Sequence, residues 1–125
     1  MRSKTPRILA ALAATVLVAT AAFHATGYSA LADSVTASAI SPFFQKALPG
    51  IWLFFSWHLI ALAMGLAWAS LRGSSSARPL VTFIALLACA DTLFVLSLAG
   101  LFAGTLLLVG AALCLVVASV RWPVA

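Results

Sequence analysis

Four long apolar runs, separated by short polar or basic stretches, dominate the pattern of this chain. They cover residues of about 8–27, 50–71, 80–99 and 101–120. A helix that rises about 1.5 Å per residue needs about 20 apolar residues to cross the hydrocarbon core of a bilayer. Backbone polar groups in lipid can be satisfied only within their own segment, so the four runs are predicted to be transmembrane helices.

The connections between the runs predict a single domain over 1–125, folded as an all-helical bundle with up-down-up-down topology. Residues 72–79 form a polar loop, and Ala99-Gly100 leaves almost no loop, so the last two helices should form a tight hairpin. Residues 29–49 are the only sizeable extramembrane segment. Within it, Ser41-Pro42 is typical of a helix start, which predicts a short interfacial helix over 43–48 before the second span.

Composition places the chain in the membrane. Of its 125 residues, 65% are hydrophobic and 7% are charged, whereas a soluble domain has about 25% charged residues. There is too little polar material to cover a globule in water. A soluble enzyme, a nucleic-acid-binding protein and a disordered tail are therefore excluded, and the lipid bilayer is the first expected partner.

The basic residues predict the orientation. The formal net charge is +5, which in a soluble protein would suggest phosphate partners, but here the charges lie at the ends of apolar runs. Basic residues near span ends stay cytoplasmic, so both termini are predicted to be inside. Lys46 alone would lie outside, and the inner side would hold Arg2, Lys4, Arg7, Arg72, Arg78 and Arg121.

Aromatic residues and loop lengths agree with this arrangement. Trp52 falls at the outer boundary, and Trp68 and Trp122 fall at the inner one, as expected for interfacial aromatic side chains. Alanine-rich spans with minimal loops are typical of a bacterial inner-membrane protein. Other membrane proteins or further copies of the chain are expected partners, and nucleic acid is not.

The first run also has the features of a signal peptide, which are basic residues, an apolar stretch and small-residue cleavage sites. Ala19-Thr20-Ala21 and Ala30-Leu31-Ala32 both fit the cleavage pattern, so removal of residues 1–21 or 1–32 is an alternative to a first span. The run is longer than the 7–15 apolar residues usual for a signal, at about 20 residues. We therefore predict a span.

Three ionisable side chains lie within the runs: His24, His58 and Asp91. Such groups are costly in lipid and usually face the interior of a bundle. At about 1.5 Å per residue, His58 and Asp91 lie at a matching depth of about 12 Å from the outer end, and His24 lies about 5 Å from it. The matching depth predicts a hydrogen-bonded pair between His58 and Asp91.

Several roles are open for these three residues. In one role, the pair serves only as a polar contact between the second and third spans. Alternatively, His24, His58 and Asp91 match the ligand set of a non-haem iron or zinc site, His24 and His58 could be axial ligands of a haem, or His58 and Asp91 could relay protons. No spacing signature such as H-E-x-x-H supports a metal site, and no catalytic residue set is evident. Cys89 and Cys114, inside apolar runs, are expected to be inert packing residues.

The expected function follows from these features. Near-absence of soluble loops and of catalytic residues favours a structural or accessory subunit of a membrane complex, with no cofactor. The alternative is a cofactor-binding or proton-relay protein that uses His24, His58 and Asp91.

Overall fold

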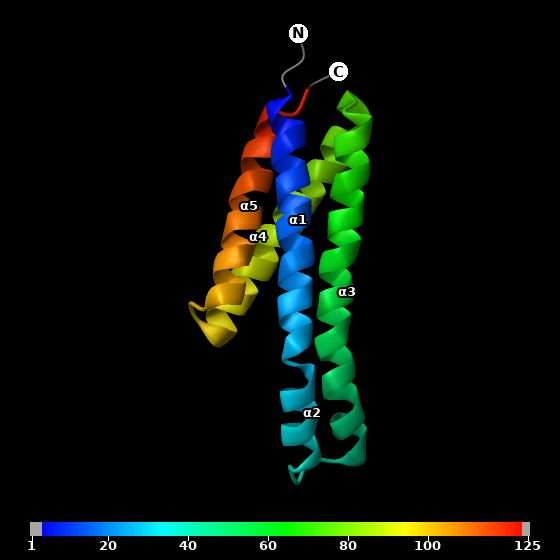
Figure 1. Ribbon diagram of the computed structural model, residues 1–125, viewed down its shortest axis with the longest axis vertical. Coiled ribbons are helices and arrows are strands. Elements are labelled where there is room, and N and C mark those ends of the chain that lie inside the picture. Colours follow the sequence, from blue (N-terminus) through cyan, green and yellow to red (C-terminus); the bar gives the residue numbers. More distant parts are fainter. Residues whose placement is uncertain (1–3, 124–125) are drawn as a thin grey trace.

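The computed structural model describes residues 4–123, and within this range all regular secondary structure is helical (Figure 1). Its elements are α1 (Thr5–Thr26), α2 (Tyr28–Thr36), α3 (Pro42–Arg72), the short 3-10 helix η1 (Ser75–Ala77), α4 (Arg78–Ala99) and α5 (Ala103–Arg121). Four segments are long and apolar enough to cross a membrane: α1 with α2, α3, η1 with α4, and α5. The all-helical, four-span class predicted from the hydropathy pattern is confirmed at this level.

The helices run antiparallel, with α1 lying between α3 and α5 and with α4 packed against α5 (Figure 1). The start of α1, the end of α5 and the connection from α3 to α4 all lie at one end of the bundle. We call this the basic end because Lys4, Arg7, Arg72, Arg78 and Arg121 belong to it. The opposite end, which holds α2 and Lys46, is the distal end. Arg2 was predicted to belong with the basic group and lies outside the described residues.

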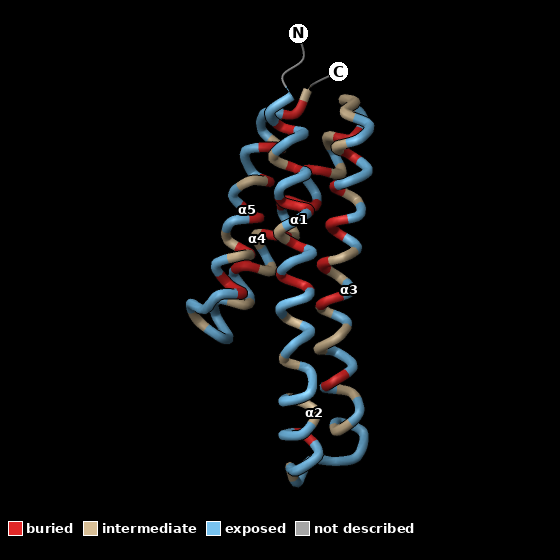
Figure 2. The backbone as a smooth tube through the Cα atoms, in the orientation of Figure 1, coloured by how far each residue is buried: buried red, intermediate tan, exposed pale blue. Residues whose placement is uncertain are grey.

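Small side chains allow the central helix to pack closely on its neighbours. One face of α1 buries Ala10, Ala13, Ala14 and Ala21, and such residues let helix backbones approach one another. Leucines from the other helices fill the space around this face, among them Leu59, Leu66, Leu108 and Leu115. Figure 2 shows that the buried positions gather toward the basic end and become sparse toward the distal end.

The predicted limits of the last two spans are close to those observed. The runs at 80–99 and 101–120 correspond to α4 and α5, which differ from them by no more than two residues at either end. Gly100 has a φ of +70°, a conformation that glycine adopts without steric cost. It lies in the short connection that joins α4 to α5, where the sequence predicted a tight hairpin.

The prediction for residues 29–49 is wrong in its detail. Residues 28–36 are helical as α2, and the predicted interfacial helix over 43–48 is not a separate element, because α3 runs without interruption from Pro42 through Pro49 to Arg72. A proline inside a helix removes one backbone donor, yet its fixed φ is compatible with helical geometry. The helix start expected at Ser41-Pro42 is observed, but it begins the second span directly.

Side chains from α1 and from the end of α5 hold the α3–α4 connection at the basic end. Nε of Arg7 donates to the carbonyl oxygen of Ser70 at 2.7 Å, and its Nη2 donates to that of Leu71 at 3.3 Å. These are terminal carbonyls of α3, which have no partner within the helix. Nε1 of the buried Trp122 donates to the carbonyl oxygen of Ser74 at 2.9 Å. The basic end is therefore closed by specific hydrogen bonds.

Candidate functional site

His58 and Asp91 form a polar contact between α3 and α4. The two helices are antiparallel, and His58 lies about as far before their connection as Asp91 lies after it, which brings the residues level. Nε2 of His58 is 3.0 Å from Oδ2 of Asp91, and the side chains are 28% and 19% exposed. The structure thus places the two residues of the predicted pair in direct contact.

His24 has different partners. Its Nδ1 is 3.0 Å from the hydroxyl oxygen of the buried Ser56, and its ring stacks on Trp52 with centroids 4.1 Å apart. Nε1 of Trp52 donates to the carbonyl oxygen of His24 at 2.9 Å. A Cβ on Gly27 would lie 2.7 Å from the Trp52 ring, so glycine at this position permits the close approach of α3. Residues of α3 therefore contact His24 at Nδ1, at the face of its ring and at its carbonyl oxygen.

The predicted metal set of His24, His58 and Asp91 is not assembled. Phe55 lies beside both imidazoles, with its ring centroid 5.0 Å from that of His24 and 6.1 Å from that of His58. Among the described residues, no three His, Cys, Asp or Glu side chains are grouped so as to hold a metal ion. The reason is that the sequence gives the depth of each residue in its span and the face of the helix on which it lies. These two properties do not determine which other helix that face packs against.

The two cysteines are half-buried free thiols. Cys89 of α4 and Cys114 of α5 both pack against the hydrophobic core. Their surroundings match the packing role expected from the sequence.

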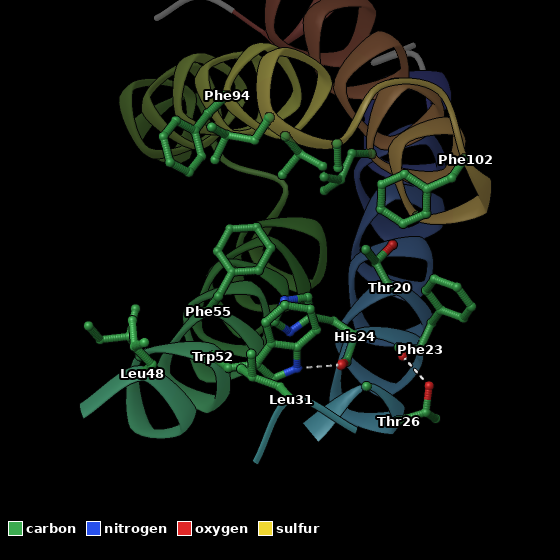
Figure 3. Close-up of a pocket in the computed structure, with 17 residues that line it drawn as sticks. Thr20, Phe23, His24, Thr26, Leu31, Leu48, Trp52, Phe55, Phe94 and Phe102 are labelled. Carbon is green, nitrogen blue, oxygen red and sulfur yellow. Dashed lines mark hydrogen bonds between the residues drawn. The ribbon is translucent and has the colours of Figure 1, made fainter. Parts of the chain in front are cut away.

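An open apolar cavity of about 530 Å³ lies beside His24 (Figure 3). Its walls come from the distal halves of α1, α3 and α4, from α2, and from the start of α5. In Figure 3, Phe55 and Phe94 lie on opposite walls, and Phe102 lies near Phe23 and Thr20. Gly104 lets the ring of Phe102 lie against α5, because a Cβ there would be 2.6 Å from it.

Most polar side-chain atoms on the cavity wall already have hydrogen-bond partners in nearby residues. The hydroxyl of Thr20 donates to the carbonyl oxygen of Val16 at 2.8 Å, and that of Thr26 donates to the carbonyl oxygen of Phe23 at 2.6 Å. With Trp52 and Nδ1 of His24 also bonded, the remaining polar position is Nε2 of His24, which has no hydrogen-bond partner among the described residues. The wall is thus an apolar surface to which His24 belongs, and Nε2 is the nitrogen of this imidazole that is left without a partner within residues 4–123.

Comparisons with protein-family models, with curated proteins and with solved structures find no match to this chain.

Sequence reasoning did not find the cavity or the contacts of Trp52. Trp52 was predicted only as a boundary residue, and Ser56 was not assigned to His24. A usable signal was present, since Phe23, Trp52, Phe55, Phe94 and Phe102 all lie near the distal ends of their runs. Aromatic residues concentrated at one end of several helices indicate a common aromatic region there.

Proposed function

We propose that this chain is a multi-pass protein of a bacterial inner (plasma) membrane, with both ends of the described chain facing the cytoplasm. The support is the charge distribution, because five basic residues belong to the basic end and Lys46 lies near the distal end. Lys and Arg near span ends are retained on the cytoplasmic side during insertion. The distal end then faces outward.

We further propose that the protein acts as a structural or accessory subunit of a membrane complex. The observation that carries this proposal is the unequal length of its helices. At about 1.5 Å per residue, α5 with 19 residues is about 28 Å long and α3 with 31 residues is about 46 Å long. A hydrocarbon core of about 30 Å matches α5 and leaves a large excess on α3.

The excess length forms a distal arm, which we define as α2 together with residues 42–50 of α3. In Figure 1 this arm extends beyond the turn between α4 and α5. Phe43 and Phe44 are 72% and 53% exposed on it, and their rings contact each other edge to face at 5.3 Å. Exposed apolar groups of this size outside the hydrocarbon core are typical of a surface that another protein covers.

The test is the mass of the particle extracted from native membranes in mild detergent, measured by native mass spectrometry. We expect the wild-type chain in an assembly heavier than one chain, with a whole multiple of the chain's own mass identifying a homo-oligomer. The double substitution Phe43→Ser and Phe44→Ser should release the free chain. Phe83→Ser, at an exposed position of α4 outside the arm, is the matched control and should leave the assembly intact. A wild-type chain that is extracted alone would contradict the accessory role.

A second candidate is a proton-relay or cofactor-binding role, and the His58–Asp91 contact of 3.0 Å is the observation in its favour. An imidazole and a carboxylate in contact can exchange a proton, and such pairs mark relays within membranes. Iron, zinc and copper quantified per chain, with an absorption spectrum for haem, test the cofactor role. A stoichiometric metal or a haem spectrum would favour this candidate over the accessory one.

A further inference from the structure

The cavity lies where α3 and α4 diverge. The two helices are joined at the basic end, meet at the His58–Asp91 contact, and separate toward the distal end (Figure 1). Phe55 is on the distal side of His58, and Phe94 and Val95 are on the distal side of Asp91; all three line the cavity. The polar pair therefore lies at the narrow end of a wedge, and the cavity is its wide part.

The size and lining of the wedge specify the class of ligand. Pockets for small molecules have volumes of roughly 300–1,000 Å³ and mainly apolar walls, and the cavity of about 530 Å³ is within this range. Water is not retained in a space without several polar partners. Lys, Arg, Asp and Glu are all absent from the described residues that line it. The matching ligand is apolar and carries no charge.

The imidazole of His24, which belongs to the cavity wall, would orient the ligand by binding its polar end. If the hydroxyl of Ser56 donates to Nδ1 of His24, the proton of the neutral imidazole is on Nε2. That nitrogen can then donate to a carbonyl oxygen. The stack against Trp52 and the edge contact with Phe55 hold the ring in place for this contact.

We propose that the cavity binds one hydrocarbon chain of a neutral, lipid-like amphiphile whose carbonyl group accepts a hydrogen bond from Nε2 of His24. The bilayer is the source of the ligand, since the wedge belongs to helices long and apolar enough to span a membrane. This inference rests on the membrane placement proposed above and is independent of the accessory role.

Two tryptophans on the same helix provide the test. Trp52 lines the cavity, whereas Trp57 does not and is 69% exposed on the outside of the bundle. One protein carries Trp57→Phe with Trp68→Phe, and the other carries Trp52→Phe with Trp68→Phe. Both keep the buried Trp122, whose fluorescence at the basic end is a constant background. Each is placed in phosphatidylcholine vesicles, and methyl dibromostearate, whose bromines quench tryptophan on contact, is added in steps.

We expect the quenching of Trp52 to saturate at low probe content, while the quenching of Trp57 rises in proportion to the probe. Proportional quenching of both would overturn the site. No quenching of Trp57 would overturn the membrane placement and the site with it. The failures of the two proposals are therefore distinguishable.

Filling the wedge provides the specificity control. Val95→Phe should remove the saturable quenching of Trp52, and Ala99→Phe is a second filling variant at an exposed position of the same wall. Leu93→Phe, which is exposed and does not line the cavity, should leave the quenching unchanged. Saturable quenching that survives in both filling variants would overturn the assignment.

The role of His24 is tested by comparing methyl dibromostearate with dibromooctadecane, which has no carbonyl group. One net hydrogen bond should make the ester bind about threefold to tenfold more tightly, and His24→Phe should remove this preference. Equal binding of the two probes by the wild-type site would overturn the hydrogen bond from His24.

Discussion

The two ends of the bundle are built from similarly apolar sequence but are organised differently. At the basic end, Arg7 and Trp122 make hydrogen bonds to the α3–α4 connection, and the small residues of α1 are buried. At the distal end, α3 and α4 separate around an open cavity, and Phe43 and Phe44 are exposed. Apolar side chains gain little from leaving lipid, so hydropathy alone does not decide which helices meet. Polar contacts and small residues decide it.

Replacing the buried tryptophan of the basic end and an exposed tryptophan of α3 should give the largest difference. Trp122→Ala removes a side chain that is 2% exposed together with its hydrogen bond to Ser74. We expect a loss of about 3 kcal/mol in the free energy of unfolding, as is usual for a buried aromatic residue. Trp57→Ala removes a side chain that is 69% exposed, and should change that free energy by less than about 0.5 kcal/mol.

Reversible unfolding in mixed micelles, followed by circular dichroism, measures both values. Equal losses for the two variants would show that the basic end is no better packed than the exposed face of α3.

The polar contact at the narrow end of the wedge should have an intermediate effect. His58→Leu leaves the Asp91 carboxyl without its partner, which should cost about 2 kcal/mol of unfolding free energy. Adding Asp91→Leu removes the unpaired group and should recover about 1 kcal/mol of that loss.

This double-mutant cycle also separates the two candidate functions. A structural contact predicts recovery in the double variant. If the pair instead relays protons or binds a cofactor, that activity or cofactor would disappear in His58→Leu, the fold would survive, and Asp91→Leu would restore nothing.

Two glycines should give the smallest effects, with opposite signs at the two ends. Gly73 has a φ of +58°, and a Cβ there would lie 2.7 Å from Nε of Arg7. Gly73→Ala should therefore cost about 1 kcal/mol through backbone strain and displacement of Arg7. Gly50 lies in α3 with nothing within 4 Å of its added Cβ, so Gly50→Ala should stabilise the helix by about 0.5 kcal/mol.

The same unfolding titration measures both glycine variants. A stabilising Gly73→Ala would contradict the close contact between Arg7 and the α3–α4 connection.

The sequence predicts where the helices lie along the chain better than it predicts how far they extend and what they contact. Runs of apolar residues locate α4 and α5 closely, because a span must satisfy its own backbone and its length is set by the bilayer. The distal arm is not predicted, because the apolar run at 50–71 begins just after Pro49, whereas α3 continues through this proline. A proline marks a boundary only statistically, and the residues on either side decide whether the helix continues.

In the candidate site, too, one contact follows from the sequence and the others do not. Equal spacing from a short connection places His58 opposite Asp91, because antiparallel helices keep residues level across the turn. His24 is different, since its partners Ser56 and Trp52 depend on the rotation of α1 against α3. The cavity depends on the divergence of α3 and α4, an angle for which the amino-acid pattern has no direct signal.

The central position of α1 has a consequence for how the bundle is made. α1 is the first described helix to leave the ribosome, and one of its two main neighbours, α5, is the last. Until α5 inserts, part of the alanine-rich face of α1 must remain against lipid or against a helper protein. Closure of the basic end, to which Trp122 contributes, therefore cannot precede the synthesis of α5, and a stall before α5 would leave an intermediate open on one side.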